Sequence, residues 1–569
     1  MKYIHEKMKS TLLVILIVLM TLYAGILVNI QKIIGINYWD IFVYLNNAML
    51  FSNINIGSQL SVPPVLSLIV AIPFRLGFIS ETSLFIVSGI FFILLIAVIY
   101  LLFNMRFTPT VSFIGSLFFS MLSLVVSWSV SGSTDIPSLT FSMLALYLTI
   151  LGVRKEFKYY YLAFLCFVLA FLTRYSAGFI LLVILSFLIM NKKIVLEQLT
   201  KKNIIKLMTL FVITILIITG IYLSFQGNIP FLSQIVEVSS STSVSKVNVG
   251  YDLNPLYYIE LLPQYLTSLS ISTFYENNLS NSYNVPTIFS YVILLFSAVG
   301  ILFISNVFFN KKDEFNDEIY VCEENQNRPQ NLLNIEIPKK VKIGIVIVLS
   351  LISIISYLHI SYIITEVMFL IIVLLFYDLY EDKINQIDLL MIILMGIYII
   401  LHSYHPVKVD RYILPILIPI VYFMIKGLTD TITKIHLKNK KIPLIILIIF
   451  LIILIPINIS YIHSMAHPNH HAYEEEKASI WIKNYDPNYS NNNISSDRGV
   501  TFSWYLKKYV YTTIPRVLKE NNDTLENKLN SIEAKYYIDS SSNLTSIEGY
   551  EKIYDNNQTD NHLAIYQRE

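Results

Sequence analysis

The sequence carries little charge for its length of 569 residues. Asp, Glu, Lys and Arg make up only 14% of it, hydrophobic residues make up 55%, and the mean hydropathy is +0.60. A soluble chain of this length needs a larger charged surface. The net charge of +2 gives no electrostatic reason to expect a nucleic-acid partner. The composition therefore excludes an ordinary soluble protein and favours a membrane protein.

Several common chemical signatures are also missing. Two cysteines, Cys166 in an apolar run and Cys322 in a polar loop, cannot form a disulfide framework. The sequence lacks a glycine-rich phosphate-binding loop, an HExxH zinc motif and a nucleophile elbow, so nucleotide-driven transport and metalloprotease chemistry have no support. Three histidines match no standard metal spacing: His467, His470 and His471. We therefore expect no required cofactor, and nothing indicates a divalent metal.

Apolar runs of about 20 residues, each long enough to cross a bilayer as a helix, dominate the sequence. The first follows Lys2, Lys7 and Lys9 but has no small-residue cleavage site, so we interpret it as a retained helix rather than a signal peptide. The run 63–79 is excluded because it is short and contains three prolines and Arg75; a juxtamembrane or re-entrant helix suits it better. The remaining candidates are thirteen spans, at 10–30, 82–103, 107–129, 135–152, 157–172, 176–190, 205–225, 287–309, 342–359, 361–379, 387–402, 412–427 and 441–462.

Lys and Arg are distributed unequally between the loops that these spans define. Most of them fall in the loops that share a side with the N-terminus. Before the C-terminal tail, the opposite loops hold few: Lys32, Arg75, Arg174, Lys246, Lys408 and Arg411. Counting 63–79 as a span would invert every later loop and remove this asymmetry. The positive-inside rule therefore predicts a cell-membrane protein with a cytoplasmic N-terminus and an extracytoplasmic C-terminus.

Long polar segments lie outside the predicted membrane. Two of them, 31–81 and 226–286, fall on the outer side. The tail contains alternating apolar strands at 535–538 and 562–566 and a helical stretch near 478–485, which is typical of a small α/β domain. We therefore predict an all-α polytopic membrane protein with about thirteen transmembrane helices, a membrane core over 1–463 and a soluble extracytoplasmic α/β domain over 464–569.

Four polar clusters fall on the predicted outer face, at 37–44, 131–137, 172–178 and 402–412. They place two carboxylates, Asp40 and Asp135, at the same membrane surface as several cations. Independent placement would scatter such residues over both faces. Each cluster also has a structural interpretation: a solvated acid at a helix end for Asp40, a helix cap for Asp135, and interfacial anchors for Arg174 and Arg411. A cation near the apolar layer costs about 2.5–3.5 kcal/mol, so we expect function only if the arginines face inward.

The four clusters resemble motifs of the GT-C superfamily of integral-membrane glycosyltransferases, in particular of the branch with protein O-mannosyltransferases and bacterial aminoarabinose transferases. That branch has an acidic residue in its first outer loop, and Asp40 stands at the similar place in this sequence. It then has a Pro-Pro-Leu-type juxtamembrane helix, whose place Pro63-Pro-Val-Leu66 takes. An Asp-x-Pro motif is similar to Asp135-Ile-Pro137. The resemblance covers roughly 1–460, and the tail is similar to the family's variable soluble domain.

Two further motifs complete the resemblance, and two departures limit it. Leu172-Thr-Arg-Tyr-Ser-Ala-Gly178 is similar to a Leu-Thr-Lys-x-x-x-Gly element with arginine in place of lysine, and Arg411-Tyr-Ile-Leu-Pro415 to an Arg-Tyr-Leu-Leu-Pro element. The aminoarabinose enzymes usually have charged residues before the Pro-Pro helix, where this chain has Ser61-Val62. No Trp-Trp-Asp-Tyr-Gly motif is present, which argues against an oligosaccharyltransferase.

The resemblance implies a mannosyltransferase-like enzyme that moves a sugar from a polyprenyl-phosphate (dolichyl-phosphate-like) donor in the membrane. The acceptor is a hydroxyl of a protein, glycan or lipid at the outer face, and a single displacement inverts the anomeric carbon. We predict that Asp40 is the catalytic base, while Asp135 orients the acceptor or holds a cation. Predicted groups for the donor phosphate are Arg411, Arg174, Lys408, His405 and Tyr412. Tyr38 and Tyr44 are predicted to position the substrate, and the scheme requires no metal.

A polytopic transporter or a lipid-linked sugar flippase without transferase activity is the competing hypothesis. It predicts ionisable residues midway through spans and inverted repeats with broken helices. The predicted spans are nearly free of charge and no repeat is visible. These observations favour the enzyme.

Thiol labelling tests the predicted topology. A single cysteine introduced at position 493 is expected to react with a membrane-impermeant thiol reagent in intact cells, whereas the native Cys322 should react only after the membrane is permeabilised. Labelling of Cys322 alone in intact cells would reverse the orientation and move every candidate residue to the cytoplasmic face.

Overall fold

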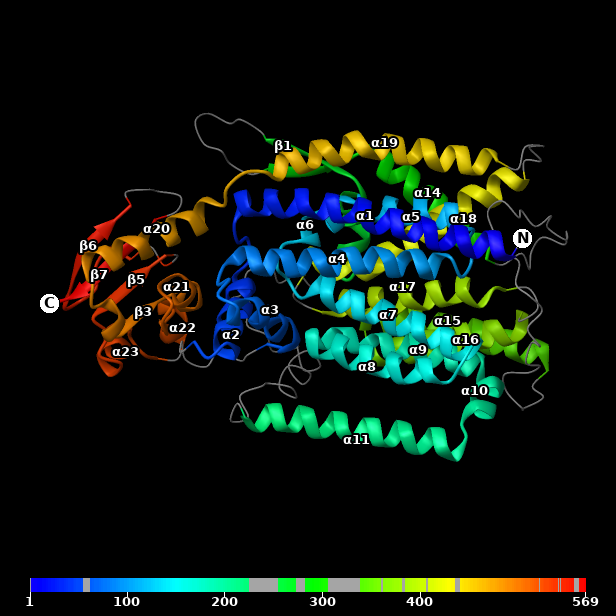
Figure 1. Ribbon diagram of the computed structural model, residues 1–569, viewed down its shortest axis with the longest axis horizontal. Coiled ribbons are helices and arrows are strands. Elements are labelled where there is room, and N and C mark those ends of the chain that lie inside the picture. Colours follow the sequence, from blue (N-terminus) through cyan, green and yellow to red (C-terminus); the bar gives the residue numbers. More distant parts are fainter. Residues whose placement is uncertain are drawn as a thin grey trace.

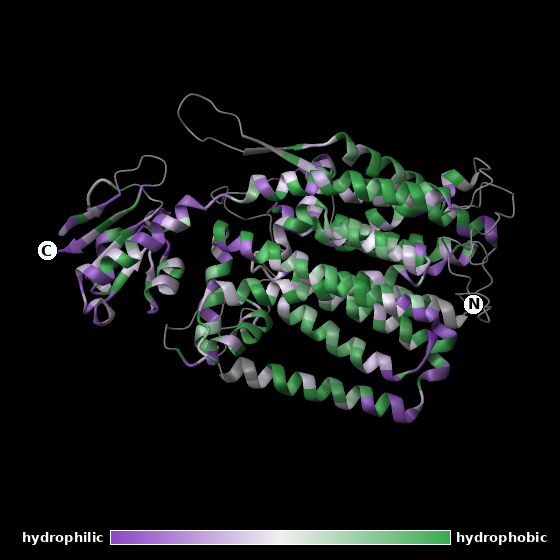
Figure 2. Ribbon diagram, turned by 45° about the horizontal axis from the view of Figure 1, so that its top comes forward, coloured by the Kyte–Doolittle hydropathy of each residue, from purple (hydrophilic) through white to green (hydrophobic). Residues whose placement is uncertain are grey.

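The computed structural model describes residues 2–54, 62–224, 254–272, 282–304, 338–359, 362–380, 384–405, 408–434, 441–520, 522–540, 542, 544–556 and 562–569. A long bundle of roughly parallel helices makes up most of the molecule, and a small domain with a β-sheet follows at one end (Figure 1). The bundle helices are mostly hydrophobic, whereas the small domain mixes hydrophilic and hydrophobic residues (Figure 2). The N-terminus lies at the bundle end far from that domain. Cys322 and the sequence from 225 to 253 lie outside the described residues.

Each of the thirteen predicted spans overlaps at least one helix of the bundle. Among the described residues, nine helices are long and apolar enough to cross a membrane. They are α1 (Lys2–Ile34), α4 (Glu81–Phe103), α7 (Asp135–Arg154), α11 (Lys201–Ser224), α15 (Lys339–His359), α16 (Tyr362–Tyr380), α17 (Gln386–Tyr404), α18 (Leu414–Lys434) and α19 (Ile442–Met465). The protein is therefore a multi-pass membrane protein, as its composition predicts.

The other four spans are shorter or bent. Helices α5 (Pro109–Ser120) and α6 (Ser123–Ser129) meet at an angle of 71°. Helix α9 (Ile180–Met190) meets α10 (Lys192–Gln198) at 89°, and α8 (Lys158–Thr173) and α14 (Ile288–Leu302) are shorter apolar helices. Helix α3 (Val65–Arg75), the run excluded above, has 11 residues with Pro73 inside it and lies beside α2 (Trp39–Phe51) at the small-domain end of the bundle (Figure 1).

The small domain is built on a five-stranded sheet with the strand order β4-β3-β5-β7-β6. Strand β3 (Ile494–Ser496) is parallel to β4 (Tyr511–Thr512) and β5 (Tyr536–Asp539), and β7 (Ala564–Arg568) is antiparallel to β5 and β6 (Tyr550–Asp555). Four helices accompany the sheet: α20 (His470–Tyr485), α21 (Gly499–Leu506), α22 (Pro515–Glu520) and α23 (Leu525–Ser531). The predicted α/β fold class of the tail is therefore confirmed.

Part of the predicted outer loop 226–286 is described before α14. It contains α13 (Tyr257–Leu266) and the antiparallel strands β1 (Ser268–Ser272) and β2 (Ser282–Pro286).

Four charged side chains at one end of the bundle form ion pairs. Asp388 in the first turn of α17 lies 3.3 Å from Arg106 Nε and 3.4 Å from Lys426 Nζ of α18. Lys426 also lies 2.8 Å from Asp430. These exceptions to the nearly uncharged spans gather at the end opposite the small domain, where they stabilise the contact between α17, α18 and the segment after α4.

Helices α14 and α18 approach each other at two glycines. A Cβ atom on Gly300 would lie 2.0 Å from the Phe423 carbonyl oxygen, and one on Gly427 would lie 1.9 Å from the Phe296 carbonyl oxygen. Small residues allow membrane helices to pack backbone against backbone, because no hydrophobic force drives them together within lipid. This contact depends on the two missing side chains.

Substitution of Gly427 by alanine tests that packing. Overpacking typically costs about 1–3 kcal/mol, so Gly427→Ala should lower the thermal unfolding midpoint of the detergent-purified protein. Gly344→Ala in α15 is the matched control, since an added Cβ there meets nothing within 4 Å. Equal midpoints for the two variants would contradict the close approach.

Candidate active site

The four predicted polar clusters meet at the bundle end that faces the small domain. Asp40 lies in the first turn of α2, and Asp135 begins α7. Arg174 lies between α8 and the short helix η1 (Tyr175–Phe179), and Arg411 lies in η4 (Asp410–Ile413), immediately before α18. Asp40 and Arg411 are in direct contact although 371 positions separate them in the sequence.

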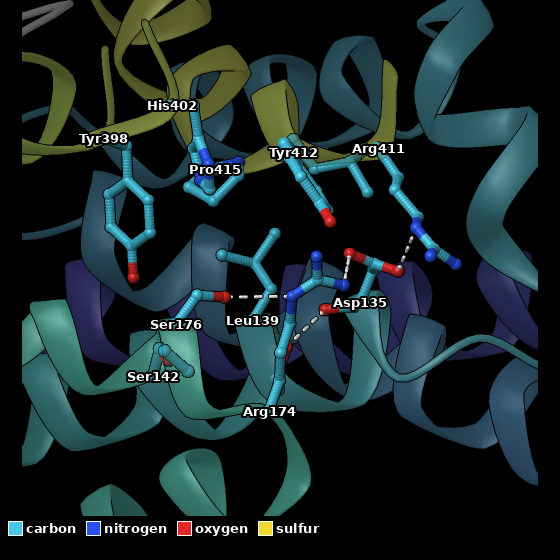
Figure 3. A pocket seen from close by; sticks show the side chains of 13 residues that line it. Asp135, Leu139, Ser142, Arg174, Ser176, Tyr398, His402, Arg411, Tyr412 and Pro415 are labelled. Atoms are coloured by element: carbon cyan, nitrogen blue, oxygen red, sulfur yellow. Dashed lines mark hydrogen bonds and ion pairs between the residues drawn. The ribbon is translucent and has the colours of Figure 1, made fainter. Parts of the chain in front are cut away.

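Acidic and basic side chains alternate in a series of contacts that runs from Asp40 through Arg411 and Asp135 to Arg174. Arg411 Nη2 donates to Asp40 Oδ2 at 2.6 Å, and Arg411 Nε lies 3.6 Å from Asp135 Oδ2. The other oxygen of Asp135 accepts from Arg174 Nη1, so Asp135 lies between two guanidinium groups (Figure 3). Arg174 Nε donates to Ser176 Oγ at 2.9 Å. The arginines therefore face inward and pair with acids, which argues against their interpretation as isolated interfacial anchors.

The two acids differ in exposure. The Asp135 side chain is 5% exposed, whereas the Asp40 side chain is 39% exposed. Thr134 precedes the helix as its N-cap residue, so the carboxylate of Asp135 serves the arginines rather than the helix end. Arg411 Nη1 is buried and has no hydrogen-bond partner among the described residues. A buried guanidinium N–H without a partner is costly, and it is a ready donor to an anionic ligand.

Aromatic side chains enclose the Arg411 guanidinium. Its central carbon lies 5.5 Å from the ring centroid of Tyr38 and 5.2 Å from that of Trp128, and these two rings are 4.4 Å apart. Trp128 Nε1 donates to Asp410 Oδ2 at 3.3 Å, and the Arg411 backbone N–H donates to Asp410 Oδ1 at 2.7 Å. Cation–π contacts and these hydrogen bonds fix the direction in which Arg411 points.

A small cavity continues from the ion pairs into the bundle. Its volume is about 20 Å³, which is enough for a single water molecule. Two of the polar atoms around it, Ser142 Oγ and His402 Nδ1, are buried without a partner in the described part of the chain. Figure 3 shows the lining: Asp135, Ser138, Leu139, Ser142, Arg174, Ser176, Ala177, Tyr398, His402, Arg411, Tyr412, Leu414 and Pro415.

Tyr412 links the Arg174 side of the site to helix α17. The guanidinium of Arg174 lies 4.7 Å from the Tyr412 ring centroid. Two histidines also contact that ring: His402 stacks on it at 4.9 Å, and His405 meets it edge-on at 5.6 Å. Tyr412 and His405 therefore lie close to the cations, although His405 does not line the cavity.

Lys408 is placed differently from the other predicted cations. Its ammonium group is buried and donates to the carbonyl oxygens of His402 at 2.9 Å and Ser403 at 2.7 Å. It also lies 5.5 Å from the Tyr258 ring. Lys408 does not line the cavity. Its hydrogen bonds instead hold the turn between α17 and η4.

Tyr44 and Tyr38 flank the acids. The Tyr44 hydroxyl lies 3.4 Å from Thr134 Oγ1, next to Asp135. Burial raises the pKa of Tyr44 to about 12 and raises the pKa of Tyr38 above its ordinary value. Both phenols are therefore neutral at physiological pH and are poor general bases, while their hydroxyls can still form hydrogen bonds.

Sequence reasoning did not single out Trp128, Asp410 or Tyr398. Trp128 closes the predicted span 107–129, and Asp410 directly precedes Arg411. Tyr398 precedes His402 by one helical turn, so the two side chains share a face of α17 and their rings lie 6.0 Å apart. Their positions in the sequence could have indicated them, because each residue lies in a polar cluster or about one helical turn from one. No group of three His, Cys, Asp or Glu side chains within the described ranges could hold a metal ion, and independence from metal stays a prediction.

Comparison with known proteins agrees with this architecture. A family model described as dolichyl-phosphate-mannose-protein mannosyltransferase matches residues 61–222. No curated protein sequence matches the chain. The crystal structure of ArnT from Cupriavidus metallidurans bound to undecaprenyl phosphate aligns with a TM-score of 0.57 and 8% identity, over 96% of this chain and 97% of that chain.

Two further structures align less closely. They are the Archaeoglobus fulgidus oligosaccharyltransferase tethered to an acceptor peptide (TM-score 0.47, 12% identity, 95% of this chain and 70% of that chain) and ArnT from C. metallidurans in the apo state (TM-score 0.45, 10% identity, 96% and 97%). The family model and the ArnT complex confirm the resemblance to the GT-C superfamily and the predicted GT-C-like fold.

Substitution of Arg411 tests whether its guanidinium binds an anion. Arg411→Ala should weaken binding of the polyprenyl-phosphate lipid that the sequence resemblance implies, measured on the purified protein. Arg411→Lys should recover only part of it, because a point charge replaces a planar fork. Lys408→Ala is the control cation, since Lys408 does not line the cavity and its ammonium group donates to two backbone carbonyls. Unchanged binding in both Arg411 variants would identify Arg411 as a structural residue only.

Proposed function

We propose that this protein is a membrane glycosyltransferase that moves a sugar from a polyprenyl-phosphate donor to an acceptor hydroxyl, with inversion at the anomeric carbon. The observation that carries the proposal is the line Asp40–Arg411–Asp135–Arg174, assembled from four distant segments at one end of a membrane bundle. The GT-C-like fold and the matching mannosyltransferase family model support it. The ArnT complex with undecaprenyl phosphate makes a polyprenyl phosphate the expected lipid. A mannose-like hexose is the proposed sugar, on the strength of the family model alone.

The arginines suit the leaving phosphate. Charge develops on the phosphate as the bond to the sugar breaks, and fixed cations in a water-poor site stabilise that charge. Arg411 has a buried N–H group still available, and Asp135 fixes both guanidinium groups before the donor arrives. We assign the donor phosphate to Arg411 and Arg174, with Tyr412 beside them. Asp135 then acts as the acid that positions the two cations.

Asp40 suits the general base. Its carboxylate is the more exposed of the two acids, and its one described charged partner is Arg411, at 2.6 Å. A donor phosphate that takes over the Arg411 N–H groups would release Asp40 toward the acceptor hydroxyl. The acceptor oxygen then attacks the anomeric carbon while its proton passes to Asp40, and the bond from that carbon to the phosphate oxygen breaks. The lipid phosphate leaves with the electron pair.

The variant Asp40→Asn tests Asp40 as the general base. It keeps the shape of the side chain but cannot accept the proton, and general-base assistance is typically worth 10²–10⁴-fold. Transfer from a radiolabelled polyprenyl-phosphate sugar to endogenous acceptors in isolated membranes should fall by about that factor, while donor binding is retained. Asp40→Glu should also be impaired, since displacing a reacting group by about 1 Å can cost on the order of 100-fold.

The control for this experiment is Glu260→Gln, which removes an exposed acid from α13 without touching the site. It should transfer sugar at the wild-type rate. An Asp40→Asn protein with the same rate as this control would exclude Asp40 as the base, whereas wild-type membranes that transfer no sugar would favour the transport hypothesis.

A further inference from the structure

The small domain contacts the helix that carries Asp40. Helix α21 lies against α2, and Asn46 Nδ2 of α2 donates to the Val500 carbonyl oxygen of α21 at 2.8 Å. One turn before Asn46, the Phe42 ring meets Tyr505 of α21 edge-on at 5.5 Å. Asn46 and Phe42 are both fully or almost fully buried. The side of α2 that these residues define is therefore covered by the soluble domain and not by lipid.

A second contact fixes the loop that enters α2. The Asn469 backbone N–H, just before α20, donates to the Ile34 carbonyl oxygen at 2.9 Å. Its side-chain Nδ2 donates to the Ile36 carbonyl oxygen, also at 2.9 Å, while its Oδ1 accepts from the His471 N–H and caps α20. Between these carbonyls Gly35 turns the chain with a φ of +77°. One asparagine thus joins the start of the soluble domain to the segment four residues before Asp40.

A third contact ties α21 to the rim of the bundle. Trp504 Nε1 donates to Glu81 Oε1 at the start of α4, at 2.9 Å, and the Trp504 ring stacks on Phe74 of α3 at 5.9 Å. Within the domain, Glu475 of α20 is fully buried and lies 2.5 Å from Arg498 Nε, at the start of α21. The Ser540 hydroxyl also donates to Glu475 at 2.9 Å. Helices α20 and α21, which make the contacts, are therefore held as one unit.

We infer that the soluble domain positions the Asp40 carboxylate for transfer, with Asn469 and the Asn46–Val500 hydrogen bond as its two attachment points. The inference rests on the proposed function of Asp40. Helix α2 is not a membrane span, so the bilayer does not set its orientation. The loop 34–38 and α2 instead take their positions from α3, the soluble domain and the contacts of Tyr38 and Asp40 with the bundle. Asn469 is then a positioning residue that acts through the backbone, and it touches no reacting group.

Two Asn469 variants distinguish positioning from helix capping. Asn469→Ala removes both the cap and the bond to Ile36. Asn469→Asp keeps an oxygen that can cap α20 but removes the N–H donor to Ile36. We expect both variants to lower turnover by about 10- to 100-fold at saturating donor, because a 1 Å displacement of a catalytic group can cost on the order of 100-fold. The donor KM should stay at the wild-type value, since Arg174, Asp135 and Arg411 remain in place.

The assay uses a sugar-radiolabelled polyprenyl-phosphate extract from the source cells as donor, with the full-length protein in membranes. Asn46→Leu, which removes the hydrogen bond to Val500, is a second variant with the same expected result. Asn493→Ala is the matched control, because it loses an amide-to-carbonyl bond of 2.8 Å to Ile532 within the soluble domain, away from α2. It should retain wild-type turnover.

Hydrogen–deuterium exchange gives a readout that does not depend on activity. Asn469→Asp and Asn46→Leu should raise exchange across residues 34–51 and leave α7 and α18 unchanged. Wild-type turnover and wild-type exchange in both variants would overturn the inference. Wild-type turnover in Asn469→Asp alone would also overturn it, and so would a loss of donor binding in either variant. A wild-type protein without transferase activity would contradict the proposed function. The exchange result would still show whether the soluble domain holds the loop 34–38 and α2 in place.

Discussion

One buried carboxylate, Asp135, determines the arrangement of the candidate site. It accepts from Arg174 and faces Arg411, two residues that the sequence separates by more than two hundred positions and that come from different short helical turns. Removing one member of such a buried charge group typically costs about 3–5 kcal/mol, because its partners keep an uncompensated charge. The position of Asp135 at the start of α7 therefore constrains the turn before α9 and the turn before α18.

The remaining features follow outward from this carboxylate. With Asp135 and the Tyr38 and Trp128 rings holding Arg411, one edge of the guanidinium reaches Asp40 on the half-exposed side of the site. With Arg174 fixed by Asp135 and Ser176, the Tyr412 ring packs on it and connects the site to His402. In the proposed mechanism the buried acid positions the cations, and the more exposed acid is the general base. Similar residues thus acquire different roles through burial alone.

The sequence predicts the membrane core well because apolar length and loop charge are local properties. Each of the thirteen predicted spans contains a helix within the described residues, and the exclusion of 63–79 is supported by the short α3 with its internal Pro73. The convergence of the four clusters is also foreseeable, since each follows or precedes a span on the same side. Contacts between side chains are not. Nothing local shows that Trp128 would enclose Arg411, or that the Lys408 ammonium group would donate to two backbone carbonyls.

The central claim is that the Asp40–Arg411–Asp135–Arg174 site consumes a sugar carried on a polyprenyl phosphate. Mass spectrometry of lipids from cells that lack the protein tests it most directly, because it requires no knowledge of the acceptor. Deletion should cause one polyprenyl-phosphate sugar to accumulate relative to wild-type cells, and the mass of that lipid would identify the sugar. A lipid-linked sugar pool identical in the two strains would contradict the account.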